Sequence, residues 1–320
     1  MTNFKRVALV AGVLAVLGCS DVSEYDPNAG SDPGTGDPND PNDPAASEAC
    51  SKMDLVFVID NSGSMAEEQA NLTANFGPFA ELIDSYLTSD GNQLDYRIAV
   101  TTAGRDVSYK LTAFDMEFPF TEPGDNGNFV NRSECGMSRP WIERGDSDVV
   151  GTFECAANVG TYGPGAEMPL LGLEWALNRR VQDGTNAGFL RDDALLAVVM
   201  VSDQDDCSRE DDGFTIDGTQ PTCFDPNDSN IISLDTYLGF LDGLKGGRGR
   251  WATAVMAGPG PGSCESSFGT AAEAVRLGDF VDQTGQNGRF SSICDGDLTT
   301  ALEDALDTFA AACEAFPPVQ

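Results

Sequence analysis

Three oxygen-bearing side chains recur at every second position near residue 60. Asp60 supplies a carboxylate, and Ser62 and Ser64 supply hydroxyls, with Gly63 between the two serines. A short turn that contains glycine can direct all three oxygens toward one point, and hard divalent cations such as Mg²⁺ prefer an all-oxygen shell. The spacing therefore predicts a cation site. The alternative is a helix N-cap, for which Ser and Asp are preferred, but a cap needs only one of the three oxygens.

A buried strand must position this turn. Residues 55–59 form an apolar run that is too short for a buried helix and rich in Val and Ile, which predicts an interior parallel strand. A second and longer apolar run, residues 195–201, ends at Ser202 and Asp203. Ligand sites of open α/β sheets lie at the carboxyl ends of strands. Asp203 is therefore the expected companion of Asp60.

The sequence Asp60-x-Ser62-x-Ser64 after a buried strand resembles the metal-ion-dependent adhesion site of von Willebrand factor type A (VWA) domains. The segments SDQDDC, which starts at Ser202, and GRFSSICDGDL, which starts at Gly288, also resemble bacterial surface lipoproteins that carry this domain. The resemblance covers roughly residues 50–313. It implies an α/β fold with a doubly wound, Rossmann-like, mostly parallel sheet, one antiparallel edge strand and helices on both faces.

The family site holds its metal with two serines, two aspartates, one often through water, and a threonine from a second loop. Asp60, Ser62 and Ser64 match residue by residue, and Asp203 matches the second aspartate. The resemblance thus implies Mg²⁺ as the cofactor, with Ca²⁺ or Mn²⁺ as alternatives.

The family threonine has no clean counterpart. Glu167 stands at its position when residues are counted back from the next helix, and Thr161 lies six residues earlier in the same loop. A glutamate would make the site more anionic, which favours retention of metal but weakens its attraction for an incoming carboxylate. The alternative is that Glu167 only places a negative charge at the helix start, where it is favourable.

The composition restricts the possible chemistry. With 18 basic and 52 acidic residues the net charge is −34, which disfavours nucleic acid and anionic lipid as partners. The chain has no histidine. This excludes Ser-His-Asp and Cys-His nucleophile systems and zinc sites that use imidazole.

The first residues predict export. A basic start and an apolar segment over residues 7–17, short for a membrane span, predict a signal peptide over residues 1–18. The residues VLGC, which end at Cys19, resemble a bacterial lipobox, with valine where leucine is commonest. This implies lipidation at Cys19 and attachment to the outer membrane or cell surface by lipid alone. The alternative is a plain signal peptide.

Residues 19–49 are rich in Asp, Pro, Gly and Asn and lack apolar periodicity, so we expect a disordered tether. Weak Ca²⁺ binding by its aspartates is a less favoured alternative. A VWA domain over residues 50–313 and a short tail, 314–320, complete the expected organisation.

Eight cysteines follow Cys19, and none has CxxC spacing, so an exported chain is expected to form up to four disulfides. Sequence does not determine their connectivity. A bond at the two ends of the domain and bonds between near neighbours give the expected pairs: Cys50–Cys313, Cys135–Cys155, Cys207–Cys223 and Cys264–Cys294.

Strand and helix patterns alternate along the domain. Besides the two apolar runs, we expect strands at 96–102, 251–257 and 288–294, with a short edge strand at 109–114 paired with 96–102. Expected helices cover 72–86 (split at Gly77-Pro78), 167–180, 234–244, 268–280 and 297–313. Residues 104–160 are mostly irregular in pattern, and long loops are often functional. We expect this insertion to set specificity.

Three functions fit the sequence. In the family, an acidic residue of a partner protein fills the metal's open position, which favours a lipid-anchored, non-enzymatic binding module with an unknown protein ligand. A metal-dependent hydrolase that uses Asp60, Asp203, Asp205 and Asp206 is an alternative. The third is an envelope scaffold in which the metal only rigidifies loops.

Overall fold

The computed structural model describes residues 51–88, 91–219, 225, 227–295 and 298–316. The expected signal peptide (1–18), the tether (19–49) with its lipidation residue Cys19, and the cysteines Cys50 and Cys223 lie outside these residues. In the described part of the chain no helix is both long and apolar enough to cross a membrane.

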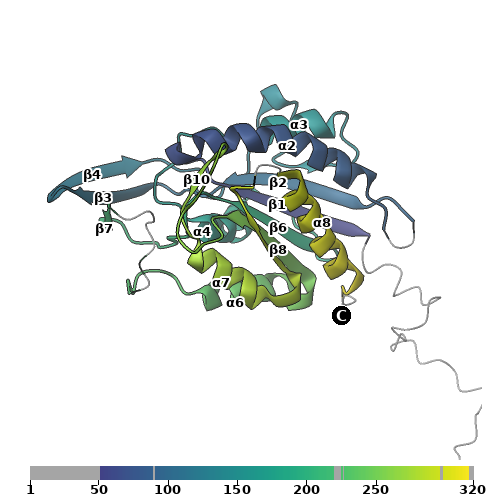
Figure 1. Cartoon of the computed structure of the whole chain (residues 1–320). Coiled ribbons are helices and arrows are strands. Elements are labelled where there is room, and N and C mark those ends of the chain that lie inside the picture. Colours follow the sequence, from purple (N-terminus) through teal and green to yellow (C-terminus); the bar gives the residue numbers. More distant parts are fainter. Residues whose placement is uncertain (1–50, 89–90, 220–224, 226, 296–297, 317–320) are drawn as a thin grey trace, which may run out of the picture.

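A six-stranded sheet forms the centre of the domain (Figure 1). Its strands are β1 (Lys52–Ile59), β2 (Asp95–Thr102), β5 (Ile142–Glu143), β6 (Leu195–Val201), β8 (Trp251–Ala257) and β11 (Gly288–Ser292). Their order is β11-β8-β6-β1-β2-β5, with every pair parallel except β2 and β5. The predicted fold class, a mostly parallel sheet with one antiparallel edge strand, is confirmed.

Helices cover both faces of the sheet, as parallel strands require. One face carries α2 (Ala66–Ser85), α3 (Val149–Ala157) and α8 (Leu298–Glu314). The other carries α4 (Pro169–Glu174), α6 (Leu234–Lys245) and α7 (Val275–Thr284), where α4 continues through a π-helical stretch (Trp175–Arg179) into α5 (Arg180–Gln182). Short 3-10 turns cover Gly63–Met65, Ser133–Cys135, Arg248–Arg250 and Gly285–Asn287.

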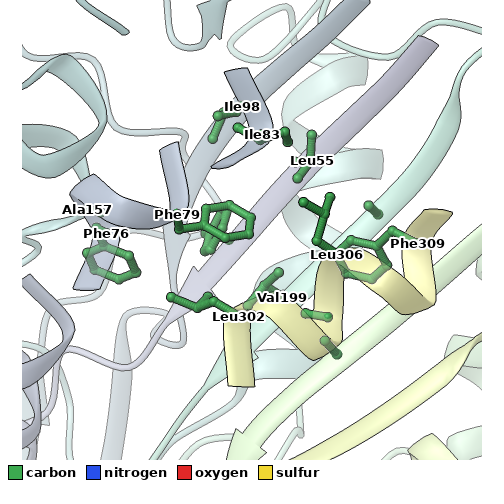
Figure 2. Packing of buried hydrophobic residues seen from close by; sticks show 14 of the residues in the cluster. Leu55, Phe76, Phe79, Ile83, Ile98, Ala157, Val199, Leu302, Leu306 and Phe309 are labelled. Carbon is green, nitrogen blue, oxygen red and sulfur yellow. The ribbon is translucent and has the colours of Figure 1, made fainter. Parts of the chain in front are cut away.

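Alternation along β1 builds two cores, because successive side chains of a strand point to opposite faces. Leu55 and Phe57 pack under α2, α3 and α8, and Val56 and Val58 face α4, α6 and α7. Figure 2 shows the first core, where α2 and α8 converge on β1. β1 is thus buried on both faces, which explains its continuous apolar sequence.

The helix after the motif differs from expectation. α2 runs without a break from Ala66 to Ser85 although Pro78 lies inside it. Phe76 and Phe79 on either side of the proline both pack edge-on against Phe57, with ring centroids 6.1 and 5.5 Å apart. We attribute the continuity of the helix to this packing, which outweighs the single hydrogen bond that proline removes.

The insertion is more regular than its sequence suggests. β3 (Val107–Ala113) and β4 (Met116–Glu122) form an antiparallel hairpin, and β7 (Phe214–Asp217) joins β3 in parallel to give a separate three-stranded sheet. The prediction that residues 109–114 pair with the second strand is therefore wrong. The antiparallel edge of the central sheet is β5, and α3 follows it.

Two of the expected disulfides lie in the described residues. Cys135 and Cys155 are bonded with their Cα atoms 5.5 Å apart, which ties the 3-10 turn Ser133–Cys135 to α3 within the insertion. Cys264 and Cys294 are bonded with Cα atoms 6.2 Å apart. Cys207 and Cys313 are also disulfide-bonded.

The helix expected over 268–280 begins later. A second hairpin, β9 (Cys264–Ser266) and β10 (Gly269–Ala271), occupies the first part of that range, and α7 starts only at Val275. Of the apolar residues that indicated one helix, Phe268 lies in the turn of this hairpin and Ala272 follows β10, and only Val275 and Phe280 lie in α7.

Candidate metal centre

Asp60 is fixed where β1 and β6 end side by side. Its backbone N–H donates to the Val201 carbonyl (2.9 Å), and its buried carboxylate accepts from the Ser62 N–H at Oδ1 (2.8 Å) and from the Ser202 hydroxyl at Oδ2 (2.7 Å). Burial raises the pKa of Asp60, and the hydrogen bonds from Ser62 and Ser202 oppose that rise. The two strands thus hold one carboxylate at the carboxyl edge of the sheet.

The two serine hydroxyls lie together beside this carboxylate. Ser62 Oγ and Ser64 Oγ are 2.9 Å apart. Ser62 precedes the turn Gly63–Met65 without a side-chain capping bond, and the N-cap of α2 is Met65. The hydroxyls therefore do not serve the helix cap that was the alternative interpretation.

Asp203 brings a second carboxylate from the end of β6. It is buried, and its Oδ1 has no hydrogen-bond partner among the described residues. Burial, followed by the negative charge of Asp60, raises the pKa of Asp203 to about 8, while a hydrogen bond with Ser64 opposes the rise. A buried carboxylate oxygen without a partner is costly unless a proton or a cation compensates it.

Glu167 adds a third carboxylate from the residue before Met168, the N-cap of α4. It is buried, and Gln204 Nε2 donates to its Oε1 (3.3 Å). Burial and then the charges of Asp60 and Asp203 hold the pKa of Glu167 well above its usual range.

Thr161 lies six residues before Glu167 in the same loop and is half-buried. The loop is held to the motif because the Gly163 N–H donates to the Asn61 carbonyl (2.7 Å). Within the described ranges the Thr161 hydroxyl makes no hydrogen bond. Glu167 is thus the residue of this loop whose charge is coupled to Asp60 and Asp203.

The donor set fits a hard divalent cation. In the described parts of the chain neither Asp60 nor Asp203 forms an ion pair with Lys or Arg. Among the residues that the structure describes, no three Asp, Glu or Cys side chains are placed so that they could hold a metal ion on their own. A cation here would therefore need the hydroxyls of Ser62 and Ser64 together with the carboxylates, which is an all-oxygen set.

Two neighbouring aspartates, Asp205 and Asp206, accept hydrogen bonds from the first turns of helices instead. Asp205 accepts from the N–H groups of Arg276 (2.8 Å) and Leu277 (3.0 Å) in the first turn of α7. Asp206 accepts from the Leu170 N–H of α4 (3.0 Å) and from Arg276 Nε (2.8 Å). These bonds fix the loop after β6 against both helices, and both oxygens of each carboxylate accept hydrogen bonds from protein groups.

One acidic residue of this region was missed by sequence reasoning. Glu68, in the first turn of α2, is buried with Oε2 unpartnered among the described residues, and its charge contributes to the raised pKa of Asp203. Gly269 of β10 lies against it, since a Cβ there would come within 1.7 Å of Glu68 Oε1. Its position one turn after the motif was the only signal in the sequence.

Comparison with known proteins gives structural likeness only. No protein-family model matches the sequence, and no curated protein does. Among solved structures, proximal thread matrix protein 1 from the mussel byssus is 12% identical, with 83% of this chain and 46% of that chain covered and a TM-score of 0.39. The pilus adhesin SpaC from Lactobacillus rhamnosus GG is 12% identical, with 81% and 30% covered and a TM-score of 0.40. This chain spans less than half the length of both.

A third similar structure is the manganese-loaded TRAP protein of Plasmodium vivax, 13% identical, with 80% of this chain and 74% of that chain covered and a TM-score of 0.33. Another structure of the mussel protein has a zinc-occupied MIDAS motif. The resemblance of this chain to VWA domains rests on its own features. These are the sheet order around β1, the Asp60-x-Ser62-x-Ser64 sequence at the carboxyl end of β1, and Asp203 at the end of β6.

Proposed function

We propose that this chain is an exported, lipid-anchored binding module that captures a protein partner through a divalent cation. The observation that supports this most directly is the buried Asp203 Oδ1, which lacks a partner among the described residues beside the buried carboxylate of Asp60. A cation would satisfy both groups at once. The VWA-like arrangement of the motif supplies the rest of the proposal.

The proposed ligands are Asp60, Ser62, Ser64 and Asp203, with Glu167 in place of the family threonine. Glu167 is preferred to Thr161 because it is buried and electrostatically coupled to the two aspartates. Mg²⁺ is the proposed ion, and Ca²⁺ or Mn²⁺ suits the same oxygen donors. When bound, the ion supplies a positive charge to which a carboxylate of the partner protein can be attracted.

The role of the protein is then to hold its oxygens in place. Ser202 and the Ser62 N–H orient Asp60, while Asp205 and Asp206 fix the loop that carries Asp203. The anchor rests on the sequence around Cys19, and the tether over residues 19–49 would set the distance from the outer membrane or cell surface.

The hydrolase alternative loses support from the structure. Two of its four carboxylates, Asp205 and Asp206, already accept hydrogen bonds at both oxygens, including bonds from backbone N–H groups of α7 and α4. The scaffold alternative shares the same ligands, so only a binding experiment separates it from the proposed function.

The test uses the full chain on intact cells. Crosslinking with and without a chelator, followed by identification of the captured proteins, should give a partner whose capture needs the cation. Asp60→Ala should abolish capture, and Asp282→Asn, which removes an exposed acid of α7, should not. Capture that persists with the chelator would contradict the bridged mechanism. Loss of thermal stability in Asp60→Ala without any loss of capture would favour the scaffold.

A further inference from the structure

The β3–β4 hairpin is amphipathic, with one apolar and one polar face. Tyr109 and Leu111 of β3 pair with Phe120 and Phe118 of β4, so their side chains share one face. The opposite face carries Lys110, which forms an ion pair with Glu117 (2.8 Å), and Ser108, which hydrogen-bonds to Thr121 (2.9 Å). β7 widens the apolar face, since Phe214 stacks on Tyr109 with centroids 5.7 Å apart.

Among the described residues, the domain body covers only the base of the apolar face. Tyr109 is buried against Met168 and Leu171 of the domain body. Toward the tip the side chains become exposed, and Figure 1 shows the hairpin extending beyond the helices. We call the exposed set the hairpin patch: Phe114 (88% exposed), Met116 (54%), Phe118 (39%) and Phe120 (36%).

The turn of the hairpin is unusual. Phe114 and Asp115 both have positive φ (53° and 60°), which is the conformation of a two-residue turn that normally takes Asn-Gly. An apolar aromatic residue in this conformation is disfavoured by both its backbone and its exposure. Nothing in the fold of the domain requires phenylalanine there, so the residue points to a role outside the fold.

The free edge of the hairpin is not suited to adding another strand. β4 is the outer strand, and Pro119 in its middle has no N–H to donate. The apolar face, rather than the edge, is therefore the surface available for contact.

The hairpin is connected to the candidate metal centre. Glu122 at its base accepts from the Tyr109 hydroxyl and from the Gly165 N–H, both at 2.9 Å. Gly165 belongs to the loop that carries Thr161 and Glu167. A partner bound over this loop would therefore lie next to the hairpin.

The charges of the three-stranded sheet formed by β4, β3 and β7 indicate which kind of partner would bind the hairpin patch. Its three strands and the turn carry one basic side chain, Lys110, and four acidic ones, Asp115, Glu117, Glu122 and Asp217. A second copy of this chain, with a net charge of −34, would be repelled. We propose that the hairpin patch is a second contact surface for a protein partner whose apolar side chains are flanked by Lys or Arg. This contact adds to the proposed function and does not depend on the metal.

A defined probe tests the proposal on the full chain. A fluorescein-labelled amphipathic peptide of leucine and lysine presents an apolar stripe between rows of ammonium groups, and its binding can be measured by fluorescence anisotropy. We expect the wild type to bind it, and Phe114→Ser with Met116→Ser to weaken binding at least about tenfold. Both side chains are exposed, so the substitutions should leave the thermal unfolding curve unchanged.

Matched variants and peptides complete the design. Phe114→Leu with Met116→Leu should retain binding, and Leu87→Ser, an exposed apolar residue elsewhere, should not change it. Equal binding of a serine and lysine peptide, or of a leucine and glutamate peptide, would overturn the proposal, as would loss of binding in Leu87→Ser. Binding should survive a chelator and Asp60→Ala, so failure of the hairpin contact and failure of the metal bridge give different results.

Discussion

Ser202 donates a hydrogen bond from its hydroxyl to Asp60 Oδ2 over 2.7 Å, although 142 positions separate the two residues in the chain. The bond joins the ends of β6 and β1. It engages one carboxylate oxygen while the Ser62 N–H engages the other, so the orientation of Asp60 is set from both strands.

Ser202→Ala should therefore weaken cation binding without removing a ligand. Groups that orient metal ligands typically contribute about 10–100-fold in affinity. We expect a loss in that range for Mg²⁺ by isothermal titration calorimetry, whereas Asp60→Ala should abolish the heat of binding. An unchanged affinity in Ser202→Ala would show that the Ser62 N–H alone suffices.

Asp203→Asn should stabilise the metal-free protein. The substitution removes a buried carboxyl group that without cation must either stay charged or hold a proton, so the melting temperature without cation should rise, most clearly near pH 8. The same variant should lose the stabilisation that Mg²⁺ gives to the wild type. Asp205→Asn is the matched control. It should lower the melting temperature, since Asp205 accepts two backbone N–H groups of α7.

The stability of the metal-free protein should fall as pH rises. The folded state holds the pKa of Asp203 at about 8, above the ordinary value of 3.8. The folded protein thus binds more protons than the unfolded chain between these values, and this contribution to stability, full below about pH 4, is lost as pH rises toward about 8. Urea unfolding at several pH values with a chelator measures this. Added Mg²⁺ should stabilise most at the upper end, and Asp203→Asn should flatten the profile.

Glu167→Gln and Thr161→Val distinguish the two candidates for the remaining ligand. Glu167 is buried and coupled to the aspartates, so Glu167→Gln should change cation affinity and the preference between Ca²⁺ and Mg²⁺. Thr161→Val, at a half-buried position, should leave both unchanged in competition titrations. The reverse outcome would assign the family threonine role to Thr161.

The core beneath the site should be sensitive to truncation. Phe57 is fully buried and has its ring 4.9 Å from that of Phe153 in α3. Phe57→Ala should cost about 3–5 kcal/mol in the free energy of unfolding, measured with denaturant. Phe118→Ala, on the exposed hairpin patch, should cost far less and serves as the comparison.

The central sheet was predictable because burial leaves a strong pattern. β1 and β6 are buried on both faces, so their sequences are continuous apolar runs, and the polar residues Asp60 and Asp203 mark where the runs end. These are the features from which the sheet and the site region were inferred.

Other features depend on contacts that a sequence does not display. The alternation of β3 predicts a strand but not its neighbours, and β5 is only two residues long. The start of α7 is fixed by Asp205, which lies 71 positions before Arg276. Glu68 and Gly269 meet only because α2 and the β9–β10 hairpin pack together.

The direction of β1 determines which way the domain faces. β1 begins at Lys52, and Asp60 follows its eight residues. At the usual rise of a strand, Lys52 and Asp60 are therefore about 27 Å apart along the strand. An attachment made through the residues before Ser51 would hold the domain by the end opposite to Asp60, Asp203 and the hairpin patch. The oxygens of the candidate metal centre would then lie on the side of the domain that faces away from the attachment, where a partner on another surface could approach them.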